Sequence, residues 1–334
     1  MAQYVLKRFL ISIVVIFVVL FITYALIYNL PENYAEIAAR EMSLLSGSQR
    51  SAAEWEQILM SEYGLDKGLI RGFLSWIFNA LCGNFGKSWY YGVDVYEKFS
   101  GAFENSISIS FISTVISILL SVPVGIYTAS ENKKSVSTIV SVLSVLLISV
   151  PAFFVIALLK YVFSIKLGLF DLGGLRSFDY IGDFGFDEFC DRFSHMILPV
   201  IAIIISNSGS LIRYVHINVQ NLLGSRYIKG LRAKGISDRN IVSKHLLRNI
   251  LVPVLNLFFT IMPAMLAGSI VVETLFSIDG IGHLAYIALI NGDIPLIMFY
   301  ITYTTFLTIG FAFIADILCA VIDYRVADTF ERRV

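Results

Sequence analysis

Two stretches of this sequence carry residue types that could do chemistry, and the first is GNFGKSW, with Gly86, Lys87 and Ser88. A Gly-Lys-Ser triplet ends the phosphate-binding loop of many nucleotide-binding proteins, in which backbone amides and the lysine hold the phosphates. The full pattern also requires glycine five residues before Gly86, and this chain has Leu81 there. No strand is predicted before the triplet. We therefore predict no nucleotide site here.

The second stretch concentrates positive charge. YIKGLRAKGISDRNIVSKHLLRN, from Tyr227 to Asn249, holds six Lys and Arg residues against one Asp, in a chain whose net charge is zero. Its first part predicts a short helix, with Ser225 as N-cap and Gly235 just past the end. Such a helix is too short to be stable alone. It requires a partner surface, either anionic lipid headgroups or a groove on another protein.

The predicted short helix has distinct faces. Tyr227, Ile228 and Leu231 share one face at helical spacing, and we expect them to form the apolar part of a contact. The basic residues Lys229 and Arg232 lie off that face. The set of candidate contact residues is Tyr227, Ile228, Lys229, Leu231, Arg232, Ala233, Lys234 and Gly235.

The cysteines offer no metal site, because Cys82, Cys190 and Cys319 lack metal-ligand spacing. A disulfide between Cys82 and Cys190 is one interpretation, and two free thiols is the one that we favour. No catalytic triad is present either. We therefore predict that the chain is not an enzyme and binds no cofactor of its own, so a pump built from it would draw energy from another protein or from an ion gradient.

The elements that must position the basic stretch are membrane helices. Of the 334 residues, 57% are hydrophobic and 15% are charged, with a mean hydropathy of +0.77, which is too apolar for one soluble core. About 20 apolar residues cross a bilayer. Six runs qualify: Phe9–Tyr28, Asn105–Ser130, Ser135–Leu159, Met196–Ile212, Asn249–Val272 and Ile294–Ala315. The first run is longer than the apolar part of a signal peptide, so we predict a retained helix.

Charge sets the expected orientation, because Lys and Arg near helix ends favour the cytoplasm. Lys133, Lys134 and the basic stretch therefore lie inside, and both termini with them. We predict an all-α protein of six transmembrane helices with this organisation: 1–30 the first helix, 31–104 an external segment, 105–322 the membrane core with a cytoplasmic loop at 220–249, and 323–334 a cytoplasmic tail.

The external segment predicts short helices. Ser51 and Glu54 form a capping-box pattern before a run that stops at Gly64. The next run places four apolar side chains near one helical face, which suits either the water–lipid interface or packing on other helices. Those four residues are Phe73, Trp76, Ile77 and Leu81.

Small polar residues recur along the second crossing at helical spacing, so they form one narrow stripe. The stripe consists of Ser106, Ser110, Ser113, Ser117 and Ser121. Small side chains allow close approach of helices, so we prefer helix packing to a substrate-lined path. A shorter stripe on the third crossing, Ser137, Ser141 and Ser144, is a candidate partner.

Two ionisable residues fall inside predicted crossings, Arg213 and Asp316, each about one to two turns from the cytoplasmic end of its helix. A charge in the membrane is costly and therefore informative. The carboxylate and histidine chain of a proton relay is absent. Two interpretations stay open: Arg213 extends toward lipid headgroups, or it forms an intramembrane ion pair with Asp316.

The ordered set of motifs resembles a known family. YIKGLRAKG, nine residues and then KHLLRNILVP is similar to the cytoplasmic loop of ABC-importer permeases, in the form used by the dipeptide and oligopeptide permeases. MAQYVLKRFLISIVVIFVVLFITYALIYNLP resembles that family's extra first helix. SVPAFFVIALLKYVFSIKLGLF and VVETLFSIDGIGHLAYIALINGDIPLI also match. The resemblance covers nearly the whole chain.

The resemblance implies a permease subunit of an ATP-driven importer in a bacterial or archaeal inner membrane. Its implied partners are a homologous second permease, two ATP-binding subunits that hold ATP and Mg, an external substrate-binding protein, a peptide cargo and the lipid bilayer. No nucleic-acid partner is implied. The alternatives are an ion-coupled secondary transporter, a lipid-binding membrane scaffold, or the same importer class carrying nickel complexes or sugars.

Overall fold

The computed structural model describes residues 2–29, 34–44, 50–130, 134–177, 185–237, 240–241 and 246–322, and within these ranges the chain is built from helices. The described part holds no strand, only an isolated bridge between Lys87 and Asp94. The predicted all-α class is confirmed. The predicted tail, 323–334, lies outside the described residues.

Among the described residues, five helices are long and apolar enough to cross a membrane, and a bent pair provides a sixth crossing if it is one span. The five belong to α1 (Ala2–Tyr28), α5 (Val95–Ser130), α8 (Phe186–Leu223), α11 (Leu247–Leu266, with the apolar run continuing to Leu275) and α14 (Ile294–Ile322). Helix α5 begins at Val95, ten residues before the predicted start of the second crossing at Asn105, because the mixed polar and apolar residues before the apolar run are also helical.

The third crossing differs from the expected continuous helix. It consists of α6 (Lys134–Ser149) and α7 (Ala152–Leu159), and α7 is extended by the π-helical η1 (Lys160–Lys166). The two parts meet at an angle of 92°.

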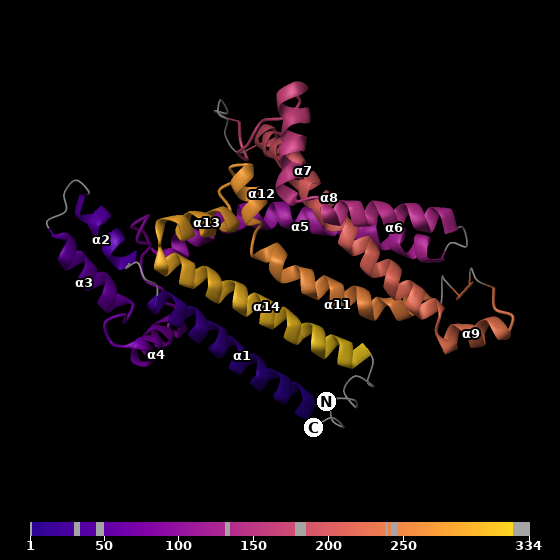
Figure 1. The fold of residues 1–334 in the computed structure, drawn as a ribbon, viewed down its shortest axis with the longest axis horizontal. Helices are drawn as coiled ribbons and strands as arrows, with labels where there is room; N and C mark the ends of the chain where they lie inside the picture. Colours follow the sequence, from indigo (N-terminus) through magenta and orange to yellow (C-terminus); the bar gives the residue numbers. More distant parts are fainter. Residues whose placement is uncertain are drawn as a thin grey trace.

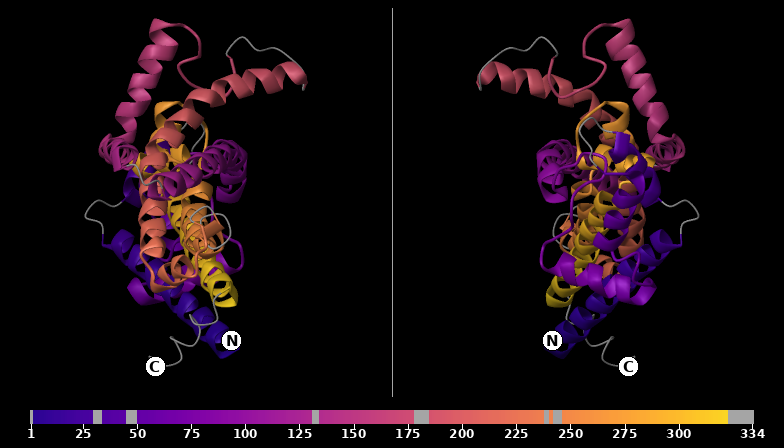
Figure 2. Two further views of the ribbon diagram at one scale, coloured as in Figure 1. Left: turned by 90° about the vertical axis from the view of Figure 1, so that its right-hand side faces the viewer. Right: turned by 90° about the vertical axis from the view of Figure 1, so that its left-hand side faces the viewer.

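 The chain turns at Pro151, the N-cap of α7 (Ala152–Leu159), because proline has no amide proton to continue the hydrogen bonds of α6. The short helix α6 therefore stays in line with the bundle, whereas α7 leaves it. Figure 2 shows α7 and the first turns of α8 projecting beyond the rest of the molecule.

The core of the membrane bundle is α8, which packs on α5, α6, α7 and α11 (Figure 1). The helices approach closely where residues are small. A Cβ atom added to Gly209 of α8 would lie 2.7 Å from the carbonyl oxygen of Ser144 on α6. Helices α1 and α14 run side by side on another flank (Figure 1). Small residues at such contacts let the backbones approach closely, and the resulting van der Waals packing drives helix association in a bilayer, where the hydrophobic effect does not.

The described part of residues 31–104, the segment expected to be external, contains three short helices, α2 (Tyr34–Leu44), α3 (Ala52–Glu62) and α4 (Leu69–Leu81). The capping box of α3 is confirmed: the Glu54 amide donates to the Ser51 hydroxyl at 3.4 Å, and the Ser51 amide donates to the Glu54 carboxylate at 2.8 Å. Helix α3 ends just before Gly64, as predicted.

Helix α4 uses two apolar faces. Phe73 and Trp76 are buried against α1, where Tyr24 contacts both rings. A second row of side chains, spaced along the other face, is exposed: Ile70, Leu74, Phe78 and Leu81. The two interpretations of this helix therefore apply to different faces, since Phe73 and Trp76 pack on the bundle and Leu81 does not.

The remaining helices lie between α11 and α14 and around the basic stretch. They are α9 (Arg226–Ala233), α12 (Ile270–Leu275) and α13 (Ile281–Asn291). Helices α12 and α13 pack on each other and sit at the same end of the bundle as the start of α14 (Figure 1). Helix α9 lies at the opposite end, beyond the last turn of α8 (Figure 1).

Candidate functional site

The basic stretch begins with the predicted helix. In α9 the Ser225 hydroxyl accepts the Ile228 amide at 3.4 Å, and this N-cap fixes the first turn. The helix ends where expected: Gly235 has φ +79°, and the Ile236 amide donates to the Leu231 carbonyl at 3.3 Å. A positive φ favours glycine, so Gly235 sets the point at which the chain leaves the helix.

The faces of α9 differ from the prediction at Ile228. We expected Ile228 to share an outward apolar face with Tyr227, but Ile228 is 1% exposed and packs within its own chain, whereas Tyr227 is 52% exposed. Consecutive residues of a helix are about 100° apart, so the two side chains cannot both face outward. We define the outer face of α9 as Tyr227, Gly230, Leu231 and Lys234, which repeat at helical spacing.

Within the outer face, Leu231 is half-buried and Lys234 is exposed. The candidate contact residues beside this face are exposed as well: Lys229, Arg232, Ala233 and Gly235. The outer face therefore combines an aromatic ring and a leucine with a rim of positive charge. This arrangement suits a groove on another protein that has apolar walls and acidic edges.

Helix α9 follows the bundle directly in the chain. Only Gly224 and Ser225 separate it from α8. After the basic stretch the chain returns to the same place, because a buried apolar cluster joins α8 to the start of α11 through Val215, Val219, Leu246 and Ile250. A displacement of α9 would therefore act on α8 and α11 together.

A cavity of 550 Å³ lies between α5, α8 and α11. Hydroxyl and amide groups line much of it, including Ser110, Thr114, Ser117, Ser206, Asn207, Ser210 and Thr260. Apolar side chains such as Leu257 and Met265 complete the wall. Neutral polar groups on an otherwise apolar wall can form hydrogen bonds with a polar solute inside the membrane.

The serine stripe of α5 is buried along its length, and α5 makes its most extensive contact with α8. Close packing of helices requires such burial. Ser110 and Ser117 also line the 550 Å³ cavity, so the stripe borders both the helix contact and the cavity. The choice between packing and pathway stays a prediction.

Ser106, the first residue of the stripe, belongs to a buried cluster around Glu273. The Glu273 carboxylate accepts four hydrogen bonds, from the Ser106 hydroxyl at 2.8 Å and the amides of Ser269, Gly282 and His283 at 3.0, 2.7 and 3.0 Å. The Ser106 oxygen in turn accepts the Ile281 amide at 2.7 Å. One side chain thereby ties α12, α13 and α5 together.

Asp293 forms a second buried cluster. Its carboxylate accepts the Ser88 hydroxyl at 2.5 Å and the amides of Trp89, Tyr90 and Leu296 at 3.1, 3.3 and 3.3 Å. Burial raises the pKa of Asp293, and these hydrogen bonds oppose the rise. Asp293 thus attaches the loop that follows α4 to the start of α14. Ser88, the end of the rejected phosphate-loop pattern, has this structural role.

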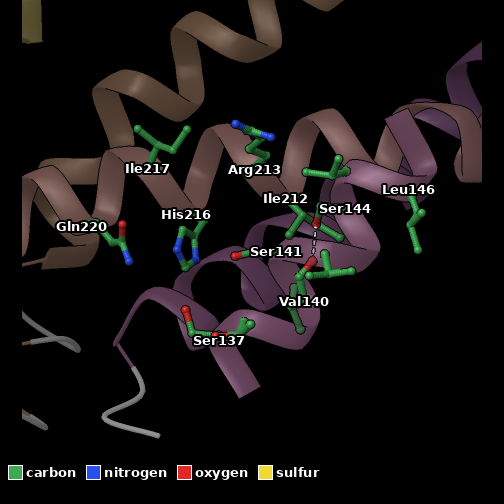
Figure 3. Close-up of a pocket in the computed structure, with 13 residues that line it drawn as sticks. Ser137, Val140, Ser141, Ser144, Leu146, Ile212, Arg213, His216, Ile217 and Gln220 are labelled. Atoms are coloured by element: carbon green, nitrogen blue, oxygen red, sulfur yellow. Dashed lines mark hydrogen bonds between the residues drawn. The ribbon is translucent and has the colours of Figure 1, made fainter. Parts of the chain in front are cut away.

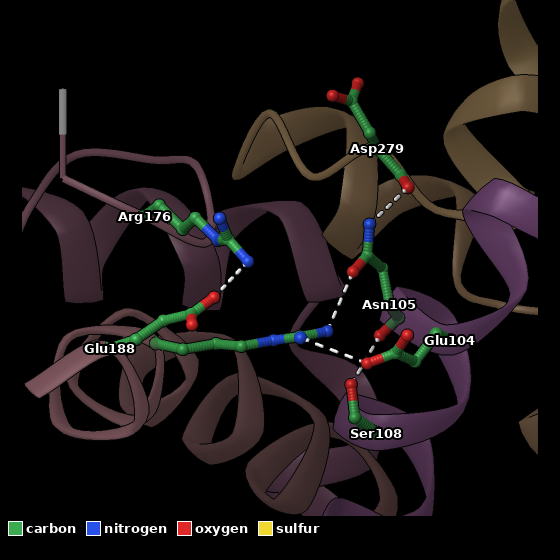
Figure 4. A network of polar contacts seen from close by, with 7 residues as sticks. Glu104, Asn105, Ser108, Arg176, Glu188 and Asp279 are labelled. Carbon is green, nitrogen blue, oxygen red and sulfur yellow. Dashed lines mark hydrogen bonds and ion pairs between the residues drawn. The ribbon is translucent and has the colours of Figure 1, made fainter. Parts of the chain in front are cut away.

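Figure 4 shows a third polar network, which reaches the loop before α13. Arg192 of α8 donates to the Glu104 carboxylate at 3.1 Å and to the Asn105 side chain at 2.9 Å. Asn105 donates to the backbone carbonyl of Asp279 at 2.8 Å. The network links α8 to α5 and α5 to the loop before α13.

Sequence reasoning missed the roles of Glu273 and Asp293. In the sequence, both residues stand out only as members of the stretch from Val271 to Ile297 that carries the family resemblance. One signal was available for Asp293, which directly precedes the expected start of the last crossing at Ile294, where a carboxylate commonly accepts amide protons.

The predicted pair of Arg213 with Asp316 is wrong. Asp316 of α14 pairs with Arg8 of α1 at 3.0 Å. The reason is packing, because α1 lies directly along α14. Arg213 lies instead on the wall of a pocket between α6 and α8 (Figure 3).

The three cysteines, Cys82, Cys190 and Cys319, are free, which confirms the interpretation that we favoured over a disulfide. Among the described residues, no group of three or more His, Cys, Asp or Glu side chains is arranged to hold a metal ion.

The chain combines a bundle of apolar helices long enough to cross a membrane, a polar internal cavity and a capped, exposed helix in a loop. This is the architecture of a transport permease. The sequence pattern of binding-protein-dependent transport system inner membrane components matches residues 121–328, and the pattern of the corresponding N-terminal part matches residues 1–96. The chain belongs to this family.

Relatives match along their whole length. The oligopeptide transport system permease protein AppB of Bacillus subtilis is 29% identical over 327 residues, which is 98% of this chain and 99% of the relative. The dipeptide transport system permease protein DppB of Lactococcus lactis is also 29% identical, with the same coverage of both chains. The metal-staphylopine import system permease protein CntB of Staphylococcus aureus is 27% identical over 328 residues, again 98% and 99% of the two chains.

Proposed function

We propose that this chain is a permease subunit of an ATP-driven importer and that the outer face of α9 docks on an ATP-binding subunit. The observation that carries the proposal is the geometry of α9: a capped helix at the end of α8, with Tyr227 exposed and Leu231 half-buried beside it. The fold of the helix bundle does not require an aromatic side chain to be exposed at this position, so contact with another protein explains the surface better.

The proposed assembly contains a homologous second permease, two ATP-binding subunits and an external substrate-binding protein. ATP and Mg belong to the ATP-binding subunits, and this chain contributes half of the membrane path. The family description names dependence on a binding protein, which supports the external partner. The location proposed is a bacterial or archaeal inner membrane, with both termini in the cytoplasm.

Transport would proceed by alternating access. Closure of the ATP-binding subunits moves α9, and α9 moves the adjoining ends of α8 and α11 through the cluster that includes Val215 and Leu246. The cavity between α5, α8 and α11 then opens to one side or the other. ATP can drive this change only if the two conformations differ in their affinity for ATP or for the loaded binding protein.

The cargo proposed is a dipeptide or oligopeptide. Two relatives of equal identity are named for peptide transport, and the uncharged polar lining of the cavity suits a peptide backbone, which both donates and accepts hydrogen bonds. A metal complex is the alternative, because CntB is named for one. Uptake of a labelled dipeptide by cells that express the complete transporter separates the two.

An ion-coupled transporter is the rival class, and it requires carboxylates free to bind an ion or a proton within the membrane. Glu273 is occupied by four hydrogen-bond donors and Asp316 by Arg8. The importer predicts uptake that stops when ATP is withheld and continues when the ion gradient is collapsed. The opposite result would favour the rival.

The orientation can be tested with the native thiols. Cys82 and Cys190 are exposed and lie on the proposed external side. They should react with a membrane-impermeant maleimide added to intact cells. A variant with Cys82→Ser, Cys190→Ser and Ser237→Cys should not react until the membrane is opened. Labelling of the Ser237→Cys variant from outside would reverse the orientation and remove the docking proposal.

The docking test is Leu231→Asp. Burying a leucine contributes about 1.5 to 3 kcal/mol, so a charge in its place should remove the ATP-binding subunit from the purified complex and abolish uptake. The matched control is Ile236→Asp, a half-buried apolar residue just beyond the helix and outside the outer face. If Leu231→Asp retains the full content of ATP-binding subunit and normal uptake, α9 is not the docking helix.

A further inference from the structure

A pocket of 610 Å³ lies between α6 and α8 on a different side of α8 from the cavity described above (Figure 3). From α8 it is lined by residues at helical spacing: Arg213, His216, Ile217 and Gln220. From α6 it is lined by the shorter serine stripe, Ser137, Ser141 and Ser144. The proposed docking and transport roles use none of these side chains.

The pocket lies at a definite depth in the membrane. His216 contacts the Thr128 hydroxyl at 3.1 Å, and Thr128 is two residues from the end of α5. Ser137 lies one turn inside the start of α6. Both helix ends mark the proposed cytoplasmic surface, so these groups lie where lipid headgroups meet the acyl chains. Arg213, about one turn deeper, reaches the same zone with its long side chain.

The chemistry of the pocket matches an anionic amphiphile. The described residues that line it include one full positive charge, Arg213, several hydroxyl groups and no carboxylate. Among the described residues, Arg213 forms no ion pair, although the same bundle supplies Asp316 with a partner. Arginine donates several hydrogen bonds in a geometry that suits phosphate oxygens.

Apolar side chains beside the polar end of the pocket also suit an amphiphile. Val142 and Leu146 of α6 and Ile217 of α8 line the same pocket and are exposed. An apolar surface that begins at the headgroup level and extends into the membrane fits acyl chains. A free phosphate or a carboxylate would use the polar end of the pocket alone.

From this juxtaposition we infer that the groove between α6 and α8 binds one anionic phospholipid. Its phosphate is held by Arg213, with Ser137 and Gln220 beside it, and its acyl chains lie along Val142 and Leu146. The lipid would fill the space beside the close contact of Gly209 with Ser144. The inference is independent of cargo and of docking by α9.

The test uses the complete transporter, purified in detergent and titrated with phosphatidylglycerol or, as the matched neutral lipid, phosphatidylcholine with the same acyl chains. Native mass spectrometry counts the bound lipid. We expect one phosphatidylglycerol to bind more tightly than phosphatidylcholine at this chain. Arg213→Gln should weaken phosphatidylglycerol binding about tenfold, since a charge-assisted hydrogen bond is lost, and should weaken phosphatidylcholine binding less, because the choline cation of that lipid already neutralises its phosphate.

Two variants serve as controls. Arg71→Gln removes an equal charge from the exposed surface of α4 and should leave lipid binding unchanged. Arg213→Lys keeps the charge and should retain most of the preference for phosphatidylglycerol. Each variant is first shown to unfold at the wild-type temperature and to retain the second permease, so that a folding defect is not read as lost binding.

Four results would overturn the inference. They are equal binding of the two lipids by the wild type, unchanged phosphatidylglycerol binding by Arg213→Gln, displacement of the lipid by inorganic phosphate, and loss of the second permease from the Arg213→Gln complex. The third result would indicate a site for small anions, and the fourth a contact between subunits.

Discussion

The two ends of the bundle are built in different ways. At the end that holds α12 and α13, Glu273 and Asp293 are buried and each accepts four hydrogen bonds, three of them from other segments. At the opposite end, α9 is secured by one N-cap and one fully buried side chain, Ile228. The first end is cross-linked by buried polar groups, whereas the second is attached by its chain connections and a small apolar contact. A transporter needs this difference if one end is to be held and the other moved.

The largest expected effect is at the cross-linked end. Glu273→Ala removes the acceptor of four donors, and each buried donor left without a partner costs about 1 to 3 kcal/mol. We expect the purified complex to lose most of its cooperative thermal unfolding, or the chain to be degraded before assembly. Glu97→Ala, at an exposed position of α5, is the control. Normal stability of Glu273→Ala would remove the contrast between the two ends.

The next effect is at the end that holds α9 and should stay local. Ile228→Ala truncates a side chain that is 1% exposed, which costs about 2 to 5 kcal/mol in well-packed cores. We expect faster hydrogen exchange in α9 with an unchanged unfolding temperature of the bundle. Tyr227→Ala, at the neighbouring exposed residue, should not change exchange. A lower unfolding temperature for Ile228→Ala would show that α9 is part of the main core.

A smaller effect is expected at the end of α9. Gly235 has φ +79°, where an L-residue costs about 1 to 2 kcal/mol and a β-branched residue is strongly disfavoured. Gly235→Val should reduce uptake while the bundle keeps its stability. Gly235→Asn, which tolerates this conformation better, should retain more uptake. Equal uptake by the two variants would mean that the direction of the chain after α9 does not matter.

The smallest effect is expected from the charged rim. Lys229 is exposed, and exposed ion pairs contribute less than about 1 kcal/mol. Lys229→Ala should weaken binding of the ATP-binding subunit modestly, and the difference from wild type should disappear at high salt. A large, salt-independent loss would instead place Lys229 in a buried part of the contact.

Local sequence signals predicted local structure well. The N-caps Ser51 and Ser225 and the helix ends at Gly64 and Gly235 were read from a few adjacent residues, because capping depends on neighbours in the chain. Proline was less informative. Pro151 breaks the third crossing, whereas Pro123 lies inside the continuous α5. Whether a proline breaks a helix depends on whether the surrounding helices can provide hydrogen-bond partners for the backbone groups that the proline leaves free.

Long-range partners were not predictable. Nothing near Asp316 in the sequence indicates that Arg8 is its partner, because that pairing depends on how α1 packs along α14. The clusters around Glu273 and Asp293 depend on contacts with Ser106 and Ser88, far away in the chain. The outward face of α9 was half right, since periodicity gives the relative positions of Tyr227 and Ile228 but not which of them faces the bundle.

Helix α8 runs over 38 residues, from Phe186 to Leu223, and carries Pro199 inside it. Its first turns leave the direction of the rest of the helix (Figure 2), as a proline inside a helix allows. The part after the proline, residues 200–223, measures about 36 Å at 1.5 Å per residue, so a tilt of about 5° around its midpoint would shift each end by about 1.6 Å in opposite directions. A pull at α9 would therefore travel through a stiff segment as far as Pro199, and the bend there would set how far Arg192 and its neighbours move.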